Sequence, residues 1–313
     1  MSFAPQEHIH LAEFSNYKIG GPARYFVNVA TVKKVKEALQ WARDYHIKIF
    51  ILGGGTNLLF DDEGFKGLVL RPSLTHITRD ATRVTAGTGV SVKDFLEFCV
   101  AHGLSGFEWA GGLPGTIGGA VRGNAGAFQG ETKDTVRAVA SIHVGTLVEK
   151  ERDKSACSFG YRASIFKTLG GEEIILSVTF DLCVGEPEEI RAAIEEKINY
   201  RAARHPLEYP NVGSMFKNVD ATQFSLDARH AFDRVIKLDP FPVVPTAYLI
   251  SEAGLKGVVR GSAQVSEKHP NFIVNTGGAT SHDVRALIAL VKKKVFEKFG
   301  VSLEEEVQIV PAQ

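Results

Sequence analysis

The sequence is poor in cysteine and carries no net charge. Its 313 residues include only three cysteines, and 36 Lys and Arg balance 36 Asp and Glu. Cys99, Cys157 and Cys183 form no CxxC pattern, which argues against a disulfide framework or a zinc site and favours a reducing compartment. Balanced, interspersed charges create no field that would attract nucleic acid or a membrane surface. We therefore expect neither as a partner, and no obligate protein partner is indicated.

Targeting, membrane and metal signals are also missing. The first ten residues, MSFAPQEHIH, contain neither a basic segment nor an apolar one, so no signal peptide is expected. No apolar stretch approaches the roughly 20 residues that span a bilayer. The ten histidines form no HExxH or similar spacing, so no metal site is expected. These features predict a cytoplasmic protein, and the length predicts two or three domains.

What the chain does have is glycine, 31 residues in all. Seven of them fall between positions 111 and 126, inside the run FEWAGGLPGTIGGAVRGNAGAFQGET (107–132). Glycine loses much backbone entropy on folding, so such a run suits a backbone that approaches a ligand or adopts positive φ. Successive main-chain N–H groups can then surround an anion such as a pyrophosphate. A second cluster, Gly53–Asn57, follows the apolar run 47–52, and two such turns suggest a dinucleotide held between them.

Neither cluster fits the GxGxxG fingerprint of a Rossmann NAD site. The segment GGGTNLLF (53–60) leads into the turn DDEGF (61–65) instead of a helix, so we reject that site. For residues 53–57, tight turns between packed strands are an equal alternative to a ligand site. For 111–126, seven glycines exceed what turns require, which favours the ligand.

Hydrophobic spacing predicts a mixture of helices and strands. The expected strands are 25–29, 48–52, 67–71, 83–86, 136–143, 172–182 and 306–310. The expected helices are 32–46, 91–102, 186–200 and 281–299. Strands 25–29 and 48–52 would form a βαβ unit with the first helix. The prolines in 205–211 indicate a boundary, after which 212–299 is mixed.

Six motifs, in matching order from about residue 14 to the C-terminus, resemble one family. They are NYKIGGPARYF (16–26), LGGGTNLLF (52–60), GFEWAGGLPGTIGGAVRGNAGAF (106–128), FGYRASIF (159–166), PNVGSMFKN (210–218) and LEEEV (303–307). This family is the UDP-N-acetylenolpyruvoylglucosamine reductases (MurB) of bacterial peptidoglycan synthesis. Only 51 residues separate Arg162 from Ser214, which resembles the shorter, type II form.

The resemblance implies an α+β fold with two domains. The first is an FAD-binding domain of the PCMH, or vanillyl-alcohol-oxidase-like, type, built from two α/β subdomains at 1–70 and 71–205, the latter completed by 300–313. The second is an α+β substrate-binding domain at 206–299. The implied reaction reduces the UDP-sugar UDP-N-acetylglucosamine enolpyruvate to UDP-N-acetylmuramate in the bacterial cytoplasm. It would use non-covalent FAD, with NADPH as co-substrate.

The implied chemistry requires a cation and a proton donor, because hydride addition to the enolpyruvyl methylene leaves negative charge beside the carboxylate. By resemblance, Arg162 is that cation and Tyr161 orients it, while Ser214 donates the proton. Taken alone, each residue type has an ordinary explanation: an arginine paired with a structural carboxylate, a packed tyrosine, and a turn serine after Gly213.

Glu306 aligns with a glutamate that positions or polarises the reacting carboxyl end. The motif here contains three successive glutamates, so Glu304 and Glu305 compete with it. A strand would place Glu304 and Glu306 on one face and Glu305 on the other.

The resemblance also implies cofactor and substrate contacts. The FAD contacts are Gly53, Gly54, Gly55, Thr56, Asn57, Gly112, Pro114, Gly115, Thr116, Gly118, Gly119, Asn124, Gly126, Ala127 and Arg201. The UDP-sugar contacts are Arg204, Lys217, Asn218 and Gln264. Arg122 departs from a frequent apolar residue and adds charge near the expected flavin, and Gln129 replaces a frequent glycine.

Two rival functions remain open from the residues. One is a flavin oxidase of the same fold type, several of which attach FAD through a histidine in the first glycine turn. Thr56 occupies that region here, with no histidine between His46 and His76. The other is an idle nucleotide-binding module, which would tolerate loss of the catalytic residues. The presence of Arg162, Ser214 and Glu306 in matching contexts favours the reductase.

Overall fold

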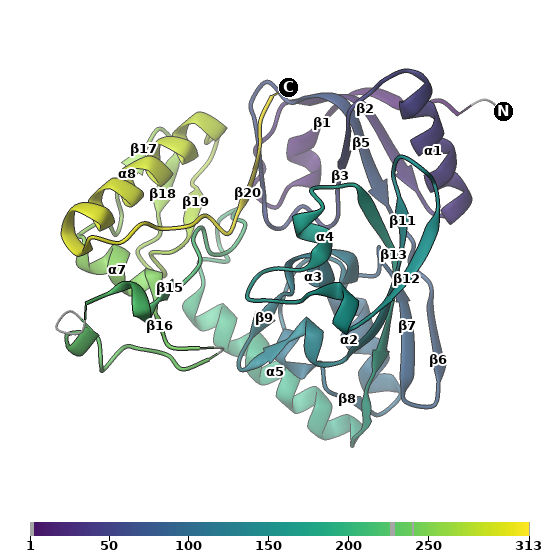
Figure 1. The fold of residues 1–313 in the computed structure, drawn as a ribbon. Coiled ribbons are helices and arrows are strands. Elements are labelled where there is room, and N and C mark those ends of the chain that lie inside the picture. The colour runs from purple at the N-terminus through teal and green to yellow at the C-terminus, as the bar shows by residue number, and fades with distance from the viewer. Residues whose placement is uncertain (1–2, 226–228, 240, 313) are drawn as a thin grey trace.

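The first unit of the chain is a mixed sheet with one helix on it. The structure is a computed structural model that describes residues 3–225, 229–239 and 241–312 (Figure 1). The sheet has the order β1-β2-β5-β3. Its strands are β1 (Gln6–His10), β2 (Pro22–Val29), β3 (Ile49–Ile51) and β5 (Phe65–Pro72). Both β2 and β3 run parallel to β5, so helix α1 (Val32–Asp44) makes the expected βαβ crossover.

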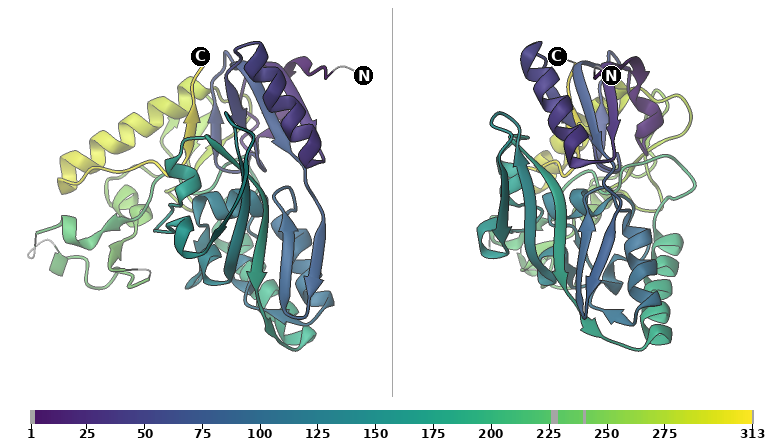
Figure 2. Two further views of the ribbon diagram at one scale, coloured as in Figure 1. Left: turned by 45° about the vertical axis from the view of Figure 1, so that its right-hand side comes forward. Right: turned by 90° about the vertical axis from the view of Figure 1, so that its right-hand side faces the viewer.

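The second unit is a five-stranded antiparallel sheet with the order β12-β11-β13-β7-β6. Its strands are β6 (Ile77–Asp80), β7 (Arg83–Gly87), β11 (Val136–His143), β12 (Glu149–Asp153) and β13 (Glu173–Asp181). Helices α2 (Val92–Ala101) and α5 (Pro187–Arg204) share its core, where the rings of Phe95, Phe107 and Phe180 contact one another. Ile142 and Leu176 of this sheet pack in the core that contains α1, so the two units are joined side by side (Figure 2).

The third unit lies beside the other two, and its core also takes in Tyr17, Ile19 and Leu59 from the first part of the chain (Figure 1). Its elements are β15 (Val219–Asp220), β16 (Val243–Val244), α7 (Thr246–Glu252), β17 (Val259–Arg260), β18 (Ala263–Val265), β19 (Ile273–Asn275) and α8 (Ser281–Phe299). A reciprocal pair of hydrogen bonds between Thr280 and Asp283 starts α8, and Gly300, with φ of +71°, ends it.

The C-terminal segment corrects the expected domain plan. Its strand β20 (Gln308–Val310) pairs in parallel with β4 (Leu58–Phe60) of the first unit. Val301 and Leu303 pack in the core of the third unit. Residues 300–313 therefore return along the third unit to the first, instead of completing 71–205 (Figure 1). The reason is hydrophobic, because the apolar side chains of this segment pack into those two cores.

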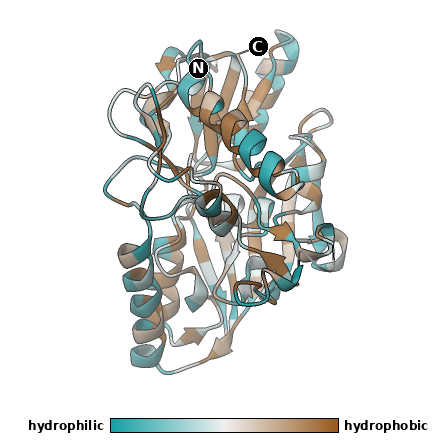
Figure 3. Cartoon of the chain, turned by 90° about the vertical axis from the view of Figure 1, so that its left-hand side faces the viewer, coloured by the Kyte–Doolittle hydropathy of each residue, from teal (hydrophilic) through white to brown (hydrophobic). Residues whose placement is uncertain are grey.

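The remaining elements are short and lie mostly around the glycine-rich run. They are β8 (Leu104–Ser105), α3 (Ile117–Gly123), β9 (Gly126–Ala127), β10 (Gly130–Glu131), α4 (Ile165–Thr168) and β14 (Cys183–Val184). Every helix and strand expected from the spacing is present with slightly shifted ends, and 136–143 and 281–299 match to the residue. Figure 3 shows hydrophobic residues concentrated on the strands and hydrophilic residues on the outer faces of helices.

Candidate active site

The two glycine clusters lie against each other, although 53 residues (58–110) separate them in the chain. A side chain on Gly54 would come within 2.7 Å of the Cα of Gly115. A side chain on Gly115 would lie 2.9 Å from the Oγ1 of Thr56. The structure thus brings together the two segments that the sequence assigned to one ligand.

The backbone of these segments requires glycine at particular points. Gly55, Gly112 and Gly115 have φ of +67°, +72° and +110°. At Gly55 a Cβ would also lie 1.8 Å from the main-chain oxygen of Phe14, which no side chain tolerates. Close backbone approach and positive φ explain the glycines here. Gly55 is buried, whereas Gly112 is exposed and Gly115 is partly exposed.

Arg201 on α5 offers a cation to the same region. Its Nε donates to the carbonyl of Gly111 at 2.8 Å, and its Cδ lies where a Cβ on Gly112 would approach to 3.0 Å. Its Nη2 is buried and has no hydrogen-bond partner within the described residues. Burial lowers the pKa of this guanidinium. An unsatisfied buried cation beside a glycine cradle fits a phosphate of FAD.

Several predicted cofactor residues use their side chains to hold the protein together. Asn57 donates to the carbonyl of Glu306 at 3.0 Å. Asn124 is fully buried, donates to the carbonyl of Gly160 at 2.8 Å and accepts the N–H of Lys133. Thr116 caps α3 by accepting the N–H of Gly119. The other predicted positions in this run, which the structure places in or beside α3 and β9, are Pro114, Gly118, Gly126 and Ala127.

Arg162 lies where the glycine-rich run meets the C-terminal segment. Its Nη2 donates to the carbonyl of Gly126 at 2.7 Å, and its Nε donates to Oε1 of Glu306 at 2.9 Å. Both side chains of the ion pair are 21% exposed. The backbone of Arg162 has φ of +52°, an uncommon conformation for a residue with a side chain. Nη1 makes no hydrogen bond in the described part of the chain, so the guanidinium retains a donor for an anion.

Glu306 is held from three sides. Besides the Arg162 contact, its N–H donates to the carbonyl of Met215 at 2.9 Å and its carbonyl accepts from Asn57. Burial raises the pKa of the Glu306 carboxyl, and the charge and hydrogen bond of Arg162 only partly oppose that shift. No strand covers 304–306, because β20 begins at Gln308. Glu304 pairs with Lys217, whereas Glu305 pairs with Lys292 of α8 at 2.8 Å.

Ser214 immediately precedes the residue that binds the Glu306 backbone. Met215 donates its N–H to Asn271 at 2.7 Å and accepts the N–H of Glu306, which fixes the segment between two parts of the third unit. The Ser214 hydroxyl makes no hydrogen bond within the described residues. It is therefore available to a bound molecule.

Tyr161 contacts Arg162 differently from the expectation. Its hydroxyl accepts the N–H of Asn218 at 3.4 Å instead of bonding to the guanidinium, which lies 5.0 Å from the centre of the tyrosine ring. The contact is thus a cation–π interaction. Burial raises the pKa of the Tyr161 hydroxyl.

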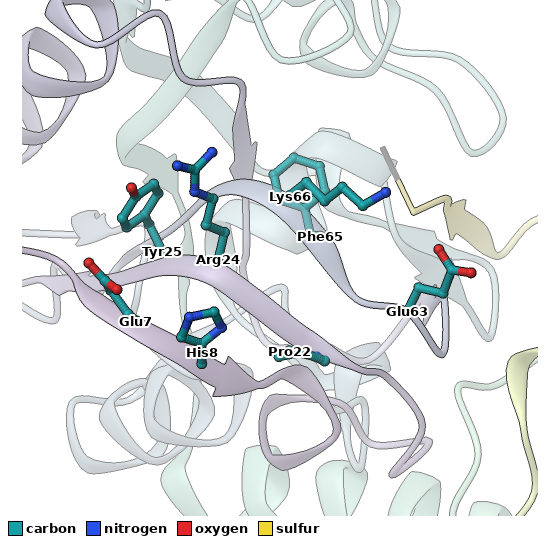
Figure 4. Close-up of a pocket in the computed structure, with 8 residues that line it drawn as sticks. All are labelled: Glu7, His8, Pro22, Arg24, Tyr25, Glu63, Phe65 and Lys66. Atoms are coloured by element: carbon teal, nitrogen blue, oxygen red, sulfur yellow. The ribbon is translucent and has the colours of Figure 1, made fainter.

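Lys217 and Asn218 line a hollow of about 140 Å³ next to Tyr161. Its other lining residues are Val219, Asp220, Gln223, Phe241, Ser302 and Glu304. A different surface hollow of about 400 Å³ lies on the first unit and contains none of the predicted site residues (Figure 4). It is lined by Glu7, His8, Pro22, Arg24, Tyr25, Glu63, Phe65 and Lys66.

Two predicted substrate residues are not gathered with these groups. Arg204 is exposed and lies over the ring of Tyr200, 4.5 Å from its centre. Gln264 donates its amide to the carbonyl of Gly257 inside the third unit. Conversely, the sequence reasoning missed Lys167, whose Nζ donates to the carbonyl of Arg162 at 2.9 Å. Its position directly after the motif FGYRASIF was the available signal.

The comparisons first define the class. A family model described as an FAD binding domain matches residues 23–146. A second, the C-terminal domain of UDP-N-acetylenolpyruvoylglucosamine reductase, matches residues 205–310. The chain is therefore a flavin-binding oxidoreductase of the expected α+β fold class, with an FAD-binding domain followed by a second domain.

Relatives specify the family. UDP-N-acetylenolpyruvoylglucosamine reductase of Clostridium perfringens is 36% identical over 96% of this chain and 91% of its own length. The enzyme of Listeria monocytogenes is 37% identical over 96% and 93%. The crystal structure of the Thermus caldophilus enzyme (MurB) covers 97% of this chain and 98% of its own, with 29% identity and a TM-score of 0.75. The chain belongs to the UDP-N-acetylenolpyruvoylglucosamine reductase family. None of its described helices has the length and hydrophobicity that crossing a membrane requires.

Proposed function

We propose that this protein reduces UDP-N-acetylglucosamine enolpyruvate to UDP-N-acetylmuramate with NADPH, through a non-covalently bound FAD, in the bacterial cytoplasm. The observation that carries the proposal is the meeting of Arg162, Glu306 and the Ser214 segment beside the glycine cradle. Family membership supplies the reaction type, and these contacts supply groups able to perform it.

The glycine segments and Arg201 would hold FAD. The buried Nη2 of Arg201, which has no hydrogen-bond partner among the described residues, fits a phosphate, and the glycine backbone at Gly112 and Gly115, which is not buried, fits a pyrophosphate. When bound, FAD supplies hydride transfer between NADPH and the enol ether.

Arg162 would bind the enolpyruvyl carboxylate through its free Nη1. When the methylene carbon gains a hydride, negative charge develops on the neighbouring carbon and its carboxylate. A guanidinium stabilises that charge without losing its own proton. The contacts to Gly126 and Glu306 hold the guanidinium in place, so little reorganisation accompanies the reaction.

Ser214 would then donate a proton to the carbon that carries the charge, which completes the addition of two hydrogens across the double bond. Its hydroxyl makes no hydrogen bond to the residues that the structure describes. Glu306, fixed one residue away through Met215, would orient the reacting end. Lys217 and Asn218, which line the adjacent hollow, would contact the UDP-sugar.

Anaerobic stopped-flow absorbance tests this proposal. NADPH should bleach the bound flavin, and UDP-N-acetylglucosamine enolpyruvate should then reoxidise it rapidly. The variant Ser214→Ala should keep FAD and the NADPH reaction but lose most of the reoxidation. A flavin that bleaches yet is reoxidised only by oxygen would contradict the reductase and indicate an oxidase.

A further inference from the structure

Lys167 supports the unusual backbone of Arg162. It belongs to the short helix α4, is half-buried, and donates its Nζ to the main-chain carbonyl of Arg162 at 2.9 Å. Arg162 has the left-handed φ of +52°, a conformation that is unfavourable for a residue with a Cβ. The contact from Lys167 helps to keep the chain in this conformation, and with it the direction of the guanidinium.

Lys167 also lies in a cluster where cations outnumber carboxylates. The cations are Arg122, Arg162, Lys167 and Lys217, and the carboxylates are Glu304 and Glu306. Glu306 pairs with Arg162 and Glu304 pairs with Lys217. In the part of the chain that the structure describes, neither Lys167 nor Arg122 has a carboxylate partner within ion-pair distance.

An anion bound from outside the chain would offset this imbalance. Burial, together with the neighbouring charges of Lys217 and Arg122, lowers the pKa of Lys167, and burial lowers that of Arg122. A bound carboxylate at Arg162 would relieve this repulsion. The substrate expected there carries such a group.

We propose that Lys167 is a positioning residue for the reductase: it holds Arg162 by its main-chain carbonyl and uses its charge to attract the substrate carboxylate to that guanidinium. The assignment rests on the proposed function. It predicts that Lys167 serves the reaction with the enol ether and contributes little to the reaction with NADPH.

The test measures the two half-reactions separately in holoenzyme variants. Lys167→Met removes the donor and the charge, whereas Lys167→Arg keeps both. The control is Lys298→Met, because Lys298 is an exposed lysine of α8 that also donates to a main-chain carbonyl, that of Glu252. All variants are compared for FAD content and thermal midpoint.

We expect Lys167→Met to slow reoxidation by the enol ether about 30-fold or more, while reduction by NADPH changes less than about threefold. Lys167→Arg should restore reoxidation to within about fivefold of the wild type. The pH above which reoxidation slows should also be higher in Lys167→Arg than in the wild type, because a guanidinium keeps its proton at higher pH than Lys167 does. The charged groups that act on the ammonium are Lys217, Glu306, Arg122 and Glu304.

Three outcomes would overturn the assignment. If Lys167→Met reacts like Lys298→Met, the residue has no role in positioning. If both half-reactions fall together, or FAD is lost, its contribution is general to the fold. If the wild-type flavin is not reoxidised by the enol ether at all, the proposed function fails and this assignment with it.

Discussion

Two arginine–glutamate pairs in this chain differ in how deeply they are buried and in how many hydrogen bonds join their side chains. Arg152 and Glu173 are 9% and 8% exposed and join through two parallel contacts, one of them 2.6 Å from Nη2 to Oε1. The hydroxyl of Ser141 adds a third bond to Glu173. Arg162 and Glu306 are 21% exposed and share one contact, with the second nitrogen directed to a main-chain carbonyl.

The glutamates of the two pairs respond in opposite ways. Hydrogen bonds from Arg152 and Ser141 lower the pKa of Glu173, because they outweigh the cost of burial. Burial raises the pKa of Glu306, because its single partner does not offset the loss of water. An ion pair whose hydrogen-bonding groups are all in use stabilises the fold, whereas a pair with an unused donor can bind a further partner. This contrast separates a structural ion pair from a site.

Arg162→Met should produce the largest effect on the reaction, because Arg162 belongs to the pair that we assign to the site. Reoxidation of reduced flavin by the enol ether should fall about 10³-fold or more, because developing charge loses its main cation. The free energy of unfolding should change by less than about 2 kcal/mol, since Glu306 can take up a proton. Stopped-flow absorbance and urea denaturation measure the two quantities. A large loss of stability with little loss of rate would reverse the assignment of the two pairs.

Arg152→Met should show the converse pattern. It leaves Glu173 buried without its partner, which costs about 3–5 kcal/mol of unfolding free energy. Enzyme that remains folded at low temperature should keep its reoxidation rate within about threefold. Urea denaturation followed by fluorescence measures the loss, with Lys298→Met as the matched surface control. If this variant were as stable as the wild type, Arg152 and Glu173 would not be a structural ion pair.

The regular elements were predictable because their spacing records which face is buried. Strand 136–143 and helix 281–299 were predicted to the residue for this reason. Strand β1 was missed, since QEHIH is polar and lies at the sheet edge, where pairing with β2 instead of burial defines it. The course of 300–313 was also missed, because local pattern does not say which strand a short segment will join.

The site was predictable only in part, for a similar reason. Motifs indicated Arg162, Ser214 and Glu306, and the structure places these segments together. Spacing could not show that Asn124 would bind Gly160 and Lys133, or that Lys167 would bind the Arg162 carbonyl. Gln129 has φ of +66°, which gives a physical reason for the glycine that the family resemblance implies at this position.

The pH dependence of stability offers the finest test of the two pairs, through Glu173→Gln and Glu306→Gln. The folded-state pKa of Glu173 lies below its unfolded value. Its ionised form therefore stabilises the fold above about pH 4.5, and that contribution is lost as the pH falls through the folded pKa. Glu173→Gln should lower the urea midpoint at pH 7, and the difference from wild type should shrink toward pH 3.

Glu306 should show the opposite sign, because its folded-state pKa lies above its unfolded value. The folded protein then binds the proton more tightly, so the ionised carboxyl opposes folding at neutral pH and this effect fades as the pH falls. Glu306→Gln should raise the urea midpoint at pH 7 and converge with wild type in acid. Urea midpoints of both variants and the wild type, measured from pH 3 to 8, test whether the two shifts have opposite signs. If both variants shift in the same direction at pH 7, the two pairs do not differ in the way their contacts indicate.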